Sequence, residues 1–141
     1  MLKEKTALVT GATRGIGRAI ALELGRLGAT VVGTATSAEG AEKISAYLAE
    51  AGVAGKGVVL NVTDSVQTDA LLNEIGPVAI LVNNAGITRD NLSMRMSDDE
   101  WDAVIDTNLK AVFRLSRGVM RGMMKARFGR IVNISSVVGY S

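Results

Sequence analysis

Five short runs of consecutive apolar or β-branched residues recur along the chain, separated by segments with the residue spacing of helices. Most of these runs have consecutive apolar residues rather than alternating apolar and polar ones, which is typical of a strand buried on both faces of a parallel sheet. Turn and capping residues bound the runs. The predicted strands cover residues 6–10, 30–36, 57–62, 78–82 and 128–134.

The intervening segments have apolar residues three and four positions apart, which indicates helices with one buried face. In the first segment these positions are Ile16, Ile20, Leu24 and Leu27. Ser37 is predicted to cap the second helix and Thr63 or Asp64 the third. Ser97-Asp98-Asp99-Glu100 has the pattern of a capping box that opens a long fourth helix. The predicted helices run from 15 to 27, from the cap at 37 to 51, from the cap at 63 or 64 to 75, and from 97 to 125.

Strands that alternate with helices predict an α/β fold, a parallel sheet covered by helices on both faces. Because crossover connections are right-handed, we expect a doubly wound Rossmann sheet in the strand order 3-2-1-4-5. A ligand should lie at the C-terminal ends of strands one and four, where the direction of winding reverses. No linker, repeat or low-complexity segment divides the chain, so residues 1–141 are predicted to form one nucleotide-binding domain.

Composition narrows the kinds of site that this domain could hold. The sequence has no cysteine and no histidine, so disulfides and thiolate chemistry are excluded and a zinc or copper site is not expected. The net charge of +2 is too small to predict nucleic-acid binding. No apolar run approaches the length of a membrane span, and the first residues lack a signal-peptide pattern. We therefore expect a cytoplasmic protein with no metal, nucleic-acid or membrane partner.

The turn between the first strand and the first helix contains three glycines. Gly11 would permit a sharp turn, Gly15 a close approach of the backbone to a ligand, and Gly17 tight packing of the helix on the strand. The free N–H groups of the first helical turn suit the pyrophosphate of a dinucleotide. The spacing Gly-x-x-x-Gly-x-Gly differs from the commonest dinucleotide fingerprint. A strand–helix turn that binds no ligand therefore stays an alternative for the glycines taken alone.

The end of the second strand bears on which dinucleotide would bind. NAD sites usually have an Asp or Glu at this strand end to hold the ribose 2′-hydroxyl, but here the strand ends Thr34-Ala35-Thr36-Ser37. Arg14 lies in the glycine loop, and a guanidinium forms charge-assisted bonds to phosphate. Arg14 and Thr36 therefore predict NADP(H) rather than NAD(H). The alternatives are a solvated Arg14 and a Thr36 present for its β-propensity.

Polar residues also follow the fourth and fifth strands. In Asn83-Asn84-Ala85-Gly86 the two amides could hold local backbone, cap neighbouring strands or contact a ligand, or they could form an ordinary turn. Ser135-Ser136 ends the fifth strand at the same edge of the sheet, where a capping or loop role is the alternative to a role in a site.

Asn108 is a polar residue on the predicted inward stripe of the long helix. The apolar members of that stripe are Trp101, Val104, Ile105, Val112, Leu115 and Val119. A buried amide that stays unpaired costs about 1–3 kcal/mol, so Asn108 needs a partner. A structural hydrogen bond to backbone and an anchoring role in an active site are both consistent with this pattern.

Taken together, these residues resemble the motifs of the short-chain dehydrogenase/reductase family over the whole chain. The segment 10–17 is similar to the family's cofactor loop, and 83–86 is similar to its second motif. The resemblance makes Asn108 the catalytic-site asparagine and Ser136 the catalytic and substrate-binding serine that polarises the carbonyl. The residues assigned to the cofactor are Gly11, Ala12, Thr13, Arg14, Ile16, Gly17, Thr36, Asn61, Val62, Asn84, Ala85 and Gly86.

Within that family, the segments 84–92, 94–96 and 136–139 look like those of bacterial 3-oxoacyl-[acyl-carrier-protein] reductases. This resemblance implies NADPH-dependent hydride transfer to a 3-oxoacyl group held on acyl carrier protein, in fatty acid synthesis. A sibling reductase of another small carbonyl compound and a non-catalytic dinucleotide-binding domain are the alternatives.

The family's general-acid tyrosine and the lysine that lowers its pKa have no counterpart in the sequence. They should lie further beyond Ser136 than Tyr140 does, and no lysine follows Tyr140. We therefore expect these residues to be the N-terminal portion of a reductase and to be inactive alone. The outer edge of the fifth strand would then be open and prone to aggregation.

Two surfaces of the long helix predict partners. The helix has more apolar surface than one face of the sheet would cover, at Val112, Val119, Met120, Met123 and Met124. They predict a homo-oligomer, and the resemblance makes it a tetramer. Cations gather near its C-terminal end at Arg117, Arg121, Lys125, Arg127 and Arg130. They offset the helix dipole, and they also suit an acidic carrier protein, for which the resemblance makes Arg127 the docking residue.

Overall fold

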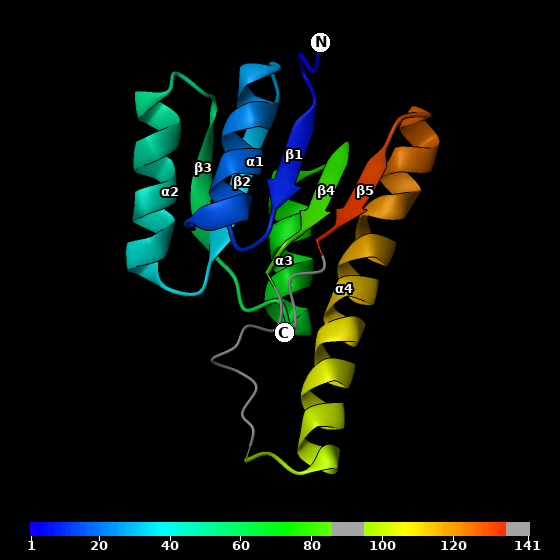
Figure 1. Cartoon of the computed structure of the whole chain (residues 1–141). Helices are drawn as coiled ribbons and strands as arrows, with labels where there is room; N and C mark the ends of the chain where they lie inside the picture. The colour runs from blue at the N-terminus through cyan, green and yellow to red at the C-terminus, as the bar shows by residue number, and fades with distance from the viewer. Residues whose placement is uncertain (86–94, 135–141) are drawn as a thin grey trace.

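The described part of the chain folds into a five-stranded sheet with helices on both faces (Figure 1). This computed structural model describes residues 1–85 and 95–134. The strands are β1 (Thr6–Val9), β2 (Thr30–Ala35), β3 (Gly55–Val59), β4 (Ile80–Asn83) and β5 (Arg130–Asn133). The helices are α1 (Gly15–Arg26), α2 (Ala38–Glu50), α3 (Ser65–Ile75) and α4 (Asp98–Ala126). All strand pairs are parallel and the order is β3-β2-β1-β4-β5, so the predicted fold class and strand order are confirmed.

The two faces of the sheet have separate hydrophobic cores, because successive side chains of a strand point to opposite faces. Ala7 and Val9 of β1 lie in one core cluster, and Leu8 between them lies in the other. The first cluster also includes Ala21 of α1 with Ile44 and Leu48 of α2, and the second includes Leu71 of α3 with Leu115 and Val119 of α4. The helices therefore cover the sheet in two pairs, α1 with α2 and α3 with α4.

The predicted helix caps are present at three of the helices. Ser37 Oγ accepts a hydrogen bond from Gly40 N–H at 3.0 Å, and Asp64, rather than Thr63, caps α3. Ser97 and Glu100 exchange both bonds of a capping box at the start of α4. These side chains satisfy N–H groups that lack intrahelical acceptors, which fixes where each helix begins.

Strand β3 begins two residues before its predicted start. Gly55 pairs with Val31 at a φ of 145°, and a Cβ there would lie 1.9 Å from Val31 O. Only glycine fits this position, so an apolar pattern could not reveal it. The strand also ends earlier than predicted, at Val59, so Asn61 and Val62 leave the sheet towards its C-terminal edge.

Helix α4 extends well past the ends of the strands (Figure 1), and this changes its predicted buried face. Its buried residues all lie from Ala111 onwards, so Ile105, predicted to face inward, is 37% exposed. Val119 and Met123, predicted for a partner surface, instead lie in the core of their own chain. The exposed apolar side chains of α4, here called the α4 stripe, are Ile105, Leu109, Phe113, Met120 and Met124.

Strand β5 forms one edge of the sheet in the described part of the chain, and Val132 on it is 42% exposed. Among the described residues, no helix combines the length and the apolar character that crossing a membrane requires.

Candidate functional site

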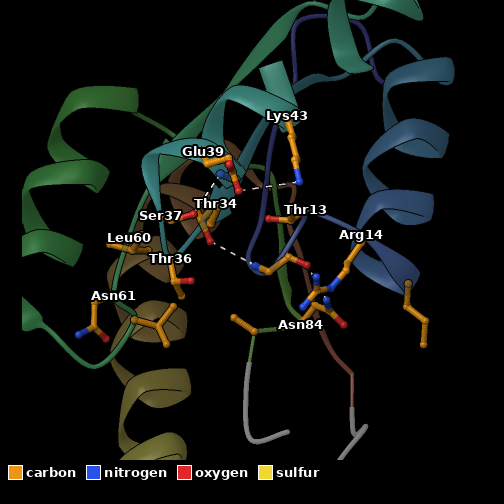
Figure 2. A pocket seen from close by; sticks show the side chains of 16 residues that line it. Thr13, Arg14, Thr34, Thr36, Ser37, Glu39, Lys43, Leu60, Asn61 and Asn84 are labelled. Carbon is orange, nitrogen blue, oxygen red and sulfur yellow. Dashed lines mark hydrogen bonds and ion pairs between the residues drawn. The ribbon is translucent and has the colours of Figure 1, made fainter. Parts of the chain in front are cut away.

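A cleft of about 680 Å³ opens at the C-terminal ends of the strands (Figure 2). The β1–α1 loop contributes Gly11, Thr13, Arg14 and Ile16 to its lining. The segments after β2 and β3 contribute Thr36, Asn61 and Val62, and the segment after β4 contributes Asn84 and Ala85. Because β1 has β2 on one side and β4 on the other, the cleft lies at the expected reversal of the winding.

The other predicted site residues lie elsewhere. Ala12 is fully buried and packs in the core, and Gly17 is buried behind the loop. Asn108 is half-buried on α4 and does not line this cleft. Gly86 and Ser136 lie outside the described residues. The roles assigned to these residues in binding and catalysis stay predictions.

The glycines of the β1–α1 loop have distinct physical roles. Gly11 and Gly15 have φ values of 60° and 61°, in the left-handed region that favours glycine. A Cβ on Gly15 would meet no atom of the described structure within 4 Å, so this side of the backbone is open. A Cβ on Gly17 would lie 2.1 Å from Gly11 O, so α1 packs on the loop carbonyl rather than on the strand itself.

Side chains from neighbouring strands hold the loop backbone. Thr34 Oγ1 accepts from Gly11 N–H at 3.2 Å, and Thr34 O accepts from Ala12 N–H at 2.9 Å. The Asn84 amide donates to Gly11 O at 2.9 Å. Asn84 therefore holds local backbone, one of the alternatives left open by the sequence, while it also lines the cleft.

Thr10 ties the end of β1 to the segment after β4. Its hydroxyl oxygen accepts from Asn84 N–H and Ala85 N–H, both at 2.9 Å, and its proton is donated to Val82 O at 3.4 Å. Thr10 is the first residue of the 10–17 motif, and the sequence alone assigned it no separate role. The signal was a hydroxyl residue at the end of an apolar strand, immediately before the first glycine.

Asn83 ties the end of β4 to β5 and α4. Its amide donates to Asn133 Oδ1 of β5 at 2.9 Å and to Ser116 Oγ of α4 at 3.4 Å, and the residue is only 4% exposed. The two adjacent asparagines thus hold different neighbours of β4: Asn84 binds the loop after β1, and Asn83 binds β5 and α4.

The start of α1 differs from the starts of the other helices. Its N-cap, Arg14, makes no side-chain hydrogen bond to the first turn, which also has no acidic residue. The N–H groups of Gly15, Ile16 and Gly17 have no intrahelical acceptor and carry the positive end of the helix dipole. An anionic group beside the open face of Gly15 would satisfy these donors, so the loop fits the pyrophosphate of a dinucleotide.

Tyr47 of α2 holds the β1–α1 loop by a hydrogen bond, a role that the sequence did not predict. Its hydroxyl donates to Ala12 O at 2.5 Å, and the Arg18 guanidinium lies 4.8 Å from its ring centroid. Burial raises the pKa of Tyr47, an effect that the positive charge of Arg18 partly opposes. The only signal in the sequence was a tyrosine on the same helix face as Ile44 and Leu48.

Replacing Tyr47 by phenylalanine should lower the free energy of unfolding by about 1 kcal/mol, because the Ala12 carbonyl loses its buried donor. Since the folded pKa is raised, the unfolded chain loses the phenolic proton first as the pH rises above about 10. Stability of the intact chain should therefore fall in that range, and the difference from Tyr47→Phe should shrink. Urea unfolding at neutral and alkaline pH measures both effects, and equal stability of the two proteins at neutral pH would contradict this role.

Comparison with known proteins agrees with this geometry. Residues 5–141 match the family model described as short chain dehydrogenase. The chain is 62% identical over 142 residues to the 3-oxoacyl-[acyl-carrier-protein] reductase FabG of Pseudomonas aeruginosa, covering 98% of this chain and 58% of that protein. It is 61% identical to the Haemophilus influenzae protein of the same name, covering 98% of this chain and 57% of that protein. For the Escherichia coli protein the identity is 62% over 139 residues, covering 96% of this chain and 56% of that protein.

The chain thus spans less than two thirds of the length of these relatives. The family match, in contrast, extends over nearly all of its own residues, from the start of β1 through the glycine loop, the cleft and α4. On this evidence the chain belongs to the short-chain dehydrogenase family.

Proposed function

We propose that this chain serves the NADPH-dependent reduction of 3-oxoacyl-[acyl-carrier-protein] to its 3-hydroxyacyl form, in cytoplasmic fatty acid synthesis. The observation that carries the proposal is identity of about 62% to relatives named for this activity, over almost the whole of the present chain. Family membership implies a nicotinamide dinucleotide cofactor. The cleft beside the uncapped start of α1 fits such a ligand.

The preference for NADP(H) is supported by the residues at the adenosine side of the cleft. Arg14 and Thr36 are both exposed and both line it. Arg14 would form charge-assisted bonds to a 2′-phosphate. Glu39 of α2 also lines the cleft, although the end of β2 carries no carboxylate. Its ion-pair partner Lys43 lines the cleft as well.

Each part of the site has a proposed task. The N–H groups at the start of α1 would hold the pyrophosphate, and Asn61 and Val62 would contact the nucleoside. The bound NADPH would supply the hydride. Ser136 would polarise the substrate carbonyl, and Asn108 would position a water that carries protons.

Joining the C-terminal part of the P. aeruginosa relative to this chain after Ser141 tests the proposal directly. Such a hybrid should oxidise NADPH when given a 3-oxoacyl-[acyl-carrier-protein], as followed by the absorbance of the reduced nicotinamide. Ser136→Ala should remove this activity while the protein stays folded by circular dichroism. Activity on free sugars or alcohols but not on the carrier-linked substrate would favour the sibling-reductase alternative.

The α4 stripe supports a homo-oligomer, which we propose to be a tetramer. Phe113 is 64% exposed and Met124 71%, an apolar area that is costly to leave in water. The first turn of α4 carries Asp98, Asp99 and Glu100, whereas its last turns are basic. Opposite charge at the two ends favours antiparallel pairing of two copies of the helix.

Phe113→Glu should convert the oligomer to a monomer in light scattering, because it places a charge in the centre of the α4 stripe. The matched control is Arg114→Glu, which adds negative charge at the adjacent position outside the stripe. A monomeric intact hybrid, or equal effects of the two substitutions, would contradict the proposed interface.

The position of Arg127 refines the predicted carrier-docking surface. Arg127 caps the end of α4 in a left-handed conformation, and β5 begins three residues later at Arg130. Because β5 is parallel to its neighbours, its start lies at the edge of the sheet opposite the cleft (Figure 1). We propose that Arg127 serves the cleft of a neighbouring subunit, since antiparallel pairing of α4 reverses the two ends.

Arg127→Glu in the hybrid should slow reduction of the carrier-linked substrate about tenfold or more at low salt, because attraction becomes repulsion for an acidic carrier. Reduction of a small free 3-oxoester should stay nearly unchanged. Steady-state rates on both substrates across a salt series measure this difference. If both substrates lose rate equally, Arg127 is a structural cap and the docking proposal is wrong.

A further inference from the structure

We propose that Lys43 acts with Arg14 in setting the preference of the cleft for a nucleotide with a 2′-phosphate, by neutralising the carboxylate of Glu39. This inference rests on the proposed NADP(H) function and assigns a specificity role to residues outside the glycine loop and the end of β2. Both residues belong to α2, and neither was singled out by the sequence motifs.

The first observation is the position of the pair. Ser37 ends the segment after β2 and caps α2, so the first turns of α2 stand directly over the end of β2. Glu39 and Lys43 are one helical turn apart, and both line the cleft. Figure 2 shows the two side chains reaching towards each other, with Lys43 Nζ 4.0 Å from Glu39 Oε1. Arg14 enters the same cleft from the β1–α1 loop.

The second observation is that this pair is not needed for the fold. The side chains of Lys43 and Glu39 are 65% and 84% exposed, and exposed ion pairs at this spacing contribute little to stability. Both side chains keep room to reorient when a ligand enters. Substitutions at either position should therefore change binding without unfolding the domain.

The third observation is the charge balance of the cleft. The charged side chains that line its described part are those of Arg14, Lys43 and Glu39, two cations and one anion. A phosphate would therefore meet net positive charge. Without Lys43 the balance is zero, and an unpaired carboxylate faces the phosphate.

An unpaired Glu39 carboxylate would also favour NAD over NADP. Dinucleotide sites that prefer NAD use an acidic residue near the end of the second strand to hold the ribose 2′-hydroxyl. Glu39 lies three residues beyond Thr36, close to that position. Lys43 therefore both attracts the 2′-phosphate and prevents Glu39 from acting as a ribose-hydroxyl acceptor.

Calorimetric titration of the 141-residue chain with NADP⁺ and with NAD⁺ tests the inference. Lys43→Met should weaken NADP⁺ binding roughly fivefold, as expected for losing one charge near a phosphate in water, and should leave NAD⁺ binding unchanged or tighter. Glu39→Gln should tighten NADP⁺ binding. The double variant, whose charge balance equals that of the intact chain, should bind NADP⁺ close to the original affinity.

Lys56→Met is the matched control. Lys56 forms an exposed pair with Glu74 at 2.9 Å and does not line the cleft, so its loss changes net charge equally and should leave both affinities unchanged. Thermal unfolding of each variant establishes that all are folded. The salt dependence of NADP⁺ binding should be steeper for the intact chain than for Lys43→Met.

The outcomes separate this inference from the proposed function. If the intact chain prefers NADP⁺ but Lys43→Met leaves the size of that preference unchanged, or if Lys56→Met reduces it as much, the inference fails and the proposed cofactor stands. An equal loss for both nucleotides in Lys43→Met also overturns it. If the intact chain binds neither nucleotide or prefers NAD⁺, the proposed cofactor preference fails, and the role of Lys43 fails with it.

Discussion

Replacing Gly17 by alanine is expected to abolish dinucleotide binding and to destabilise the domain. The new methyl group would lie 2.1 Å from Gly11 O and 2.6 Å from the Asn84 amide nitrogen, too close to both partners of the hydrogen bond that joins them. Inserting a methyl group into a packed site costs about 1–3 kcal/mol. The backbone carbonyl of Gly11 cannot rotate away, so we expect the upper end of that range, beyond the roughly 1 kcal/mol that alanine gains in helix propensity.

Gly122 in α4 is the matched control for this substitution. It is also a helical glycine, but a Cβ there would meet no described atom within 4 Å. Gly122→Ala should therefore be neutral or stabilise the chain by up to about 1 kcal/mol. Urea unfolding and calorimetric titration with NADP⁺ measure the two variants. Equal stability of Gly17→Ala and Gly122→Ala would show that α1 does not pack on the loop as described.

Thr10→Val should have the second largest effect. Valine has nearly the same shape but no acceptor, so the N–H groups of Asn84 and Ala85 lose the hydroxyl oxygen that both now share. These N–H groups are part-buried, so each one left without a partner should cost about 1–1.5 kcal/mol, at the lower end of the range for buried donors. The expected loss in the free energy of unfolding is therefore roughly 2–3 kcal/mol. Binding of NADP⁺ should weaken as well, because Asn84 and Ala85 line the cleft.

Two variants isolate the acceptor role of Thr10. Thr10→Ser keeps the oxygen and should retain most of the stability. Thr68 is equally buried, at 1% exposed, but its hydroxyl only donates to Asp64 O, which also accepts the N–H of Thr68. Thr68→Val therefore leaves no N–H without a partner and should cost about 1 kcal/mol or less. A loss of similar size in Thr10→Val and Thr68→Val would contradict the proposed bracing.

The fold was predictable because buried parallel strands and amphipathic helices differ in their periodicity. Continuous apolar runs located all five strands, and the side chains of Ser37, Ser97 and Glu100 located the starts of two helices. Errors arose where tertiary contacts decide the outcome. Gly55 enters a strand because only a residue without a Cβ fits beside Val31, and Ile105 is exposed because α4 is longer than the sheet it covers.

The cleft was predictable at its glycine loop and strand ends, where chain order alone places residues at one edge of the sheet. The residues that were missed contact the loop or the cleft from positions far away in the sequence. Tyr47 reaches Ala12 from the second helix, and Lys43 reaches the cleft from the same helix. Their roles depend on how α2 packs beside the loop, which periodicity does not specify. The motif residue Ser136 lies outside the described residues, so its role stays a prediction.

Titrating the intact chain separately with NADP⁺ and NAD⁺ shows most directly whether the cleft is an NADP(H) site. We expect saturable binding of both nucleotides, with tighter binding of NADP⁺. Arg14→Ala should weaken NADP⁺ binding roughly tenfold or more, while NAD⁺ binding changes little, because the guanidinium serves the 2′-phosphate. Equal affinities for the two nucleotides, tighter binding of NAD⁺, or no binding of either would contradict this expectation.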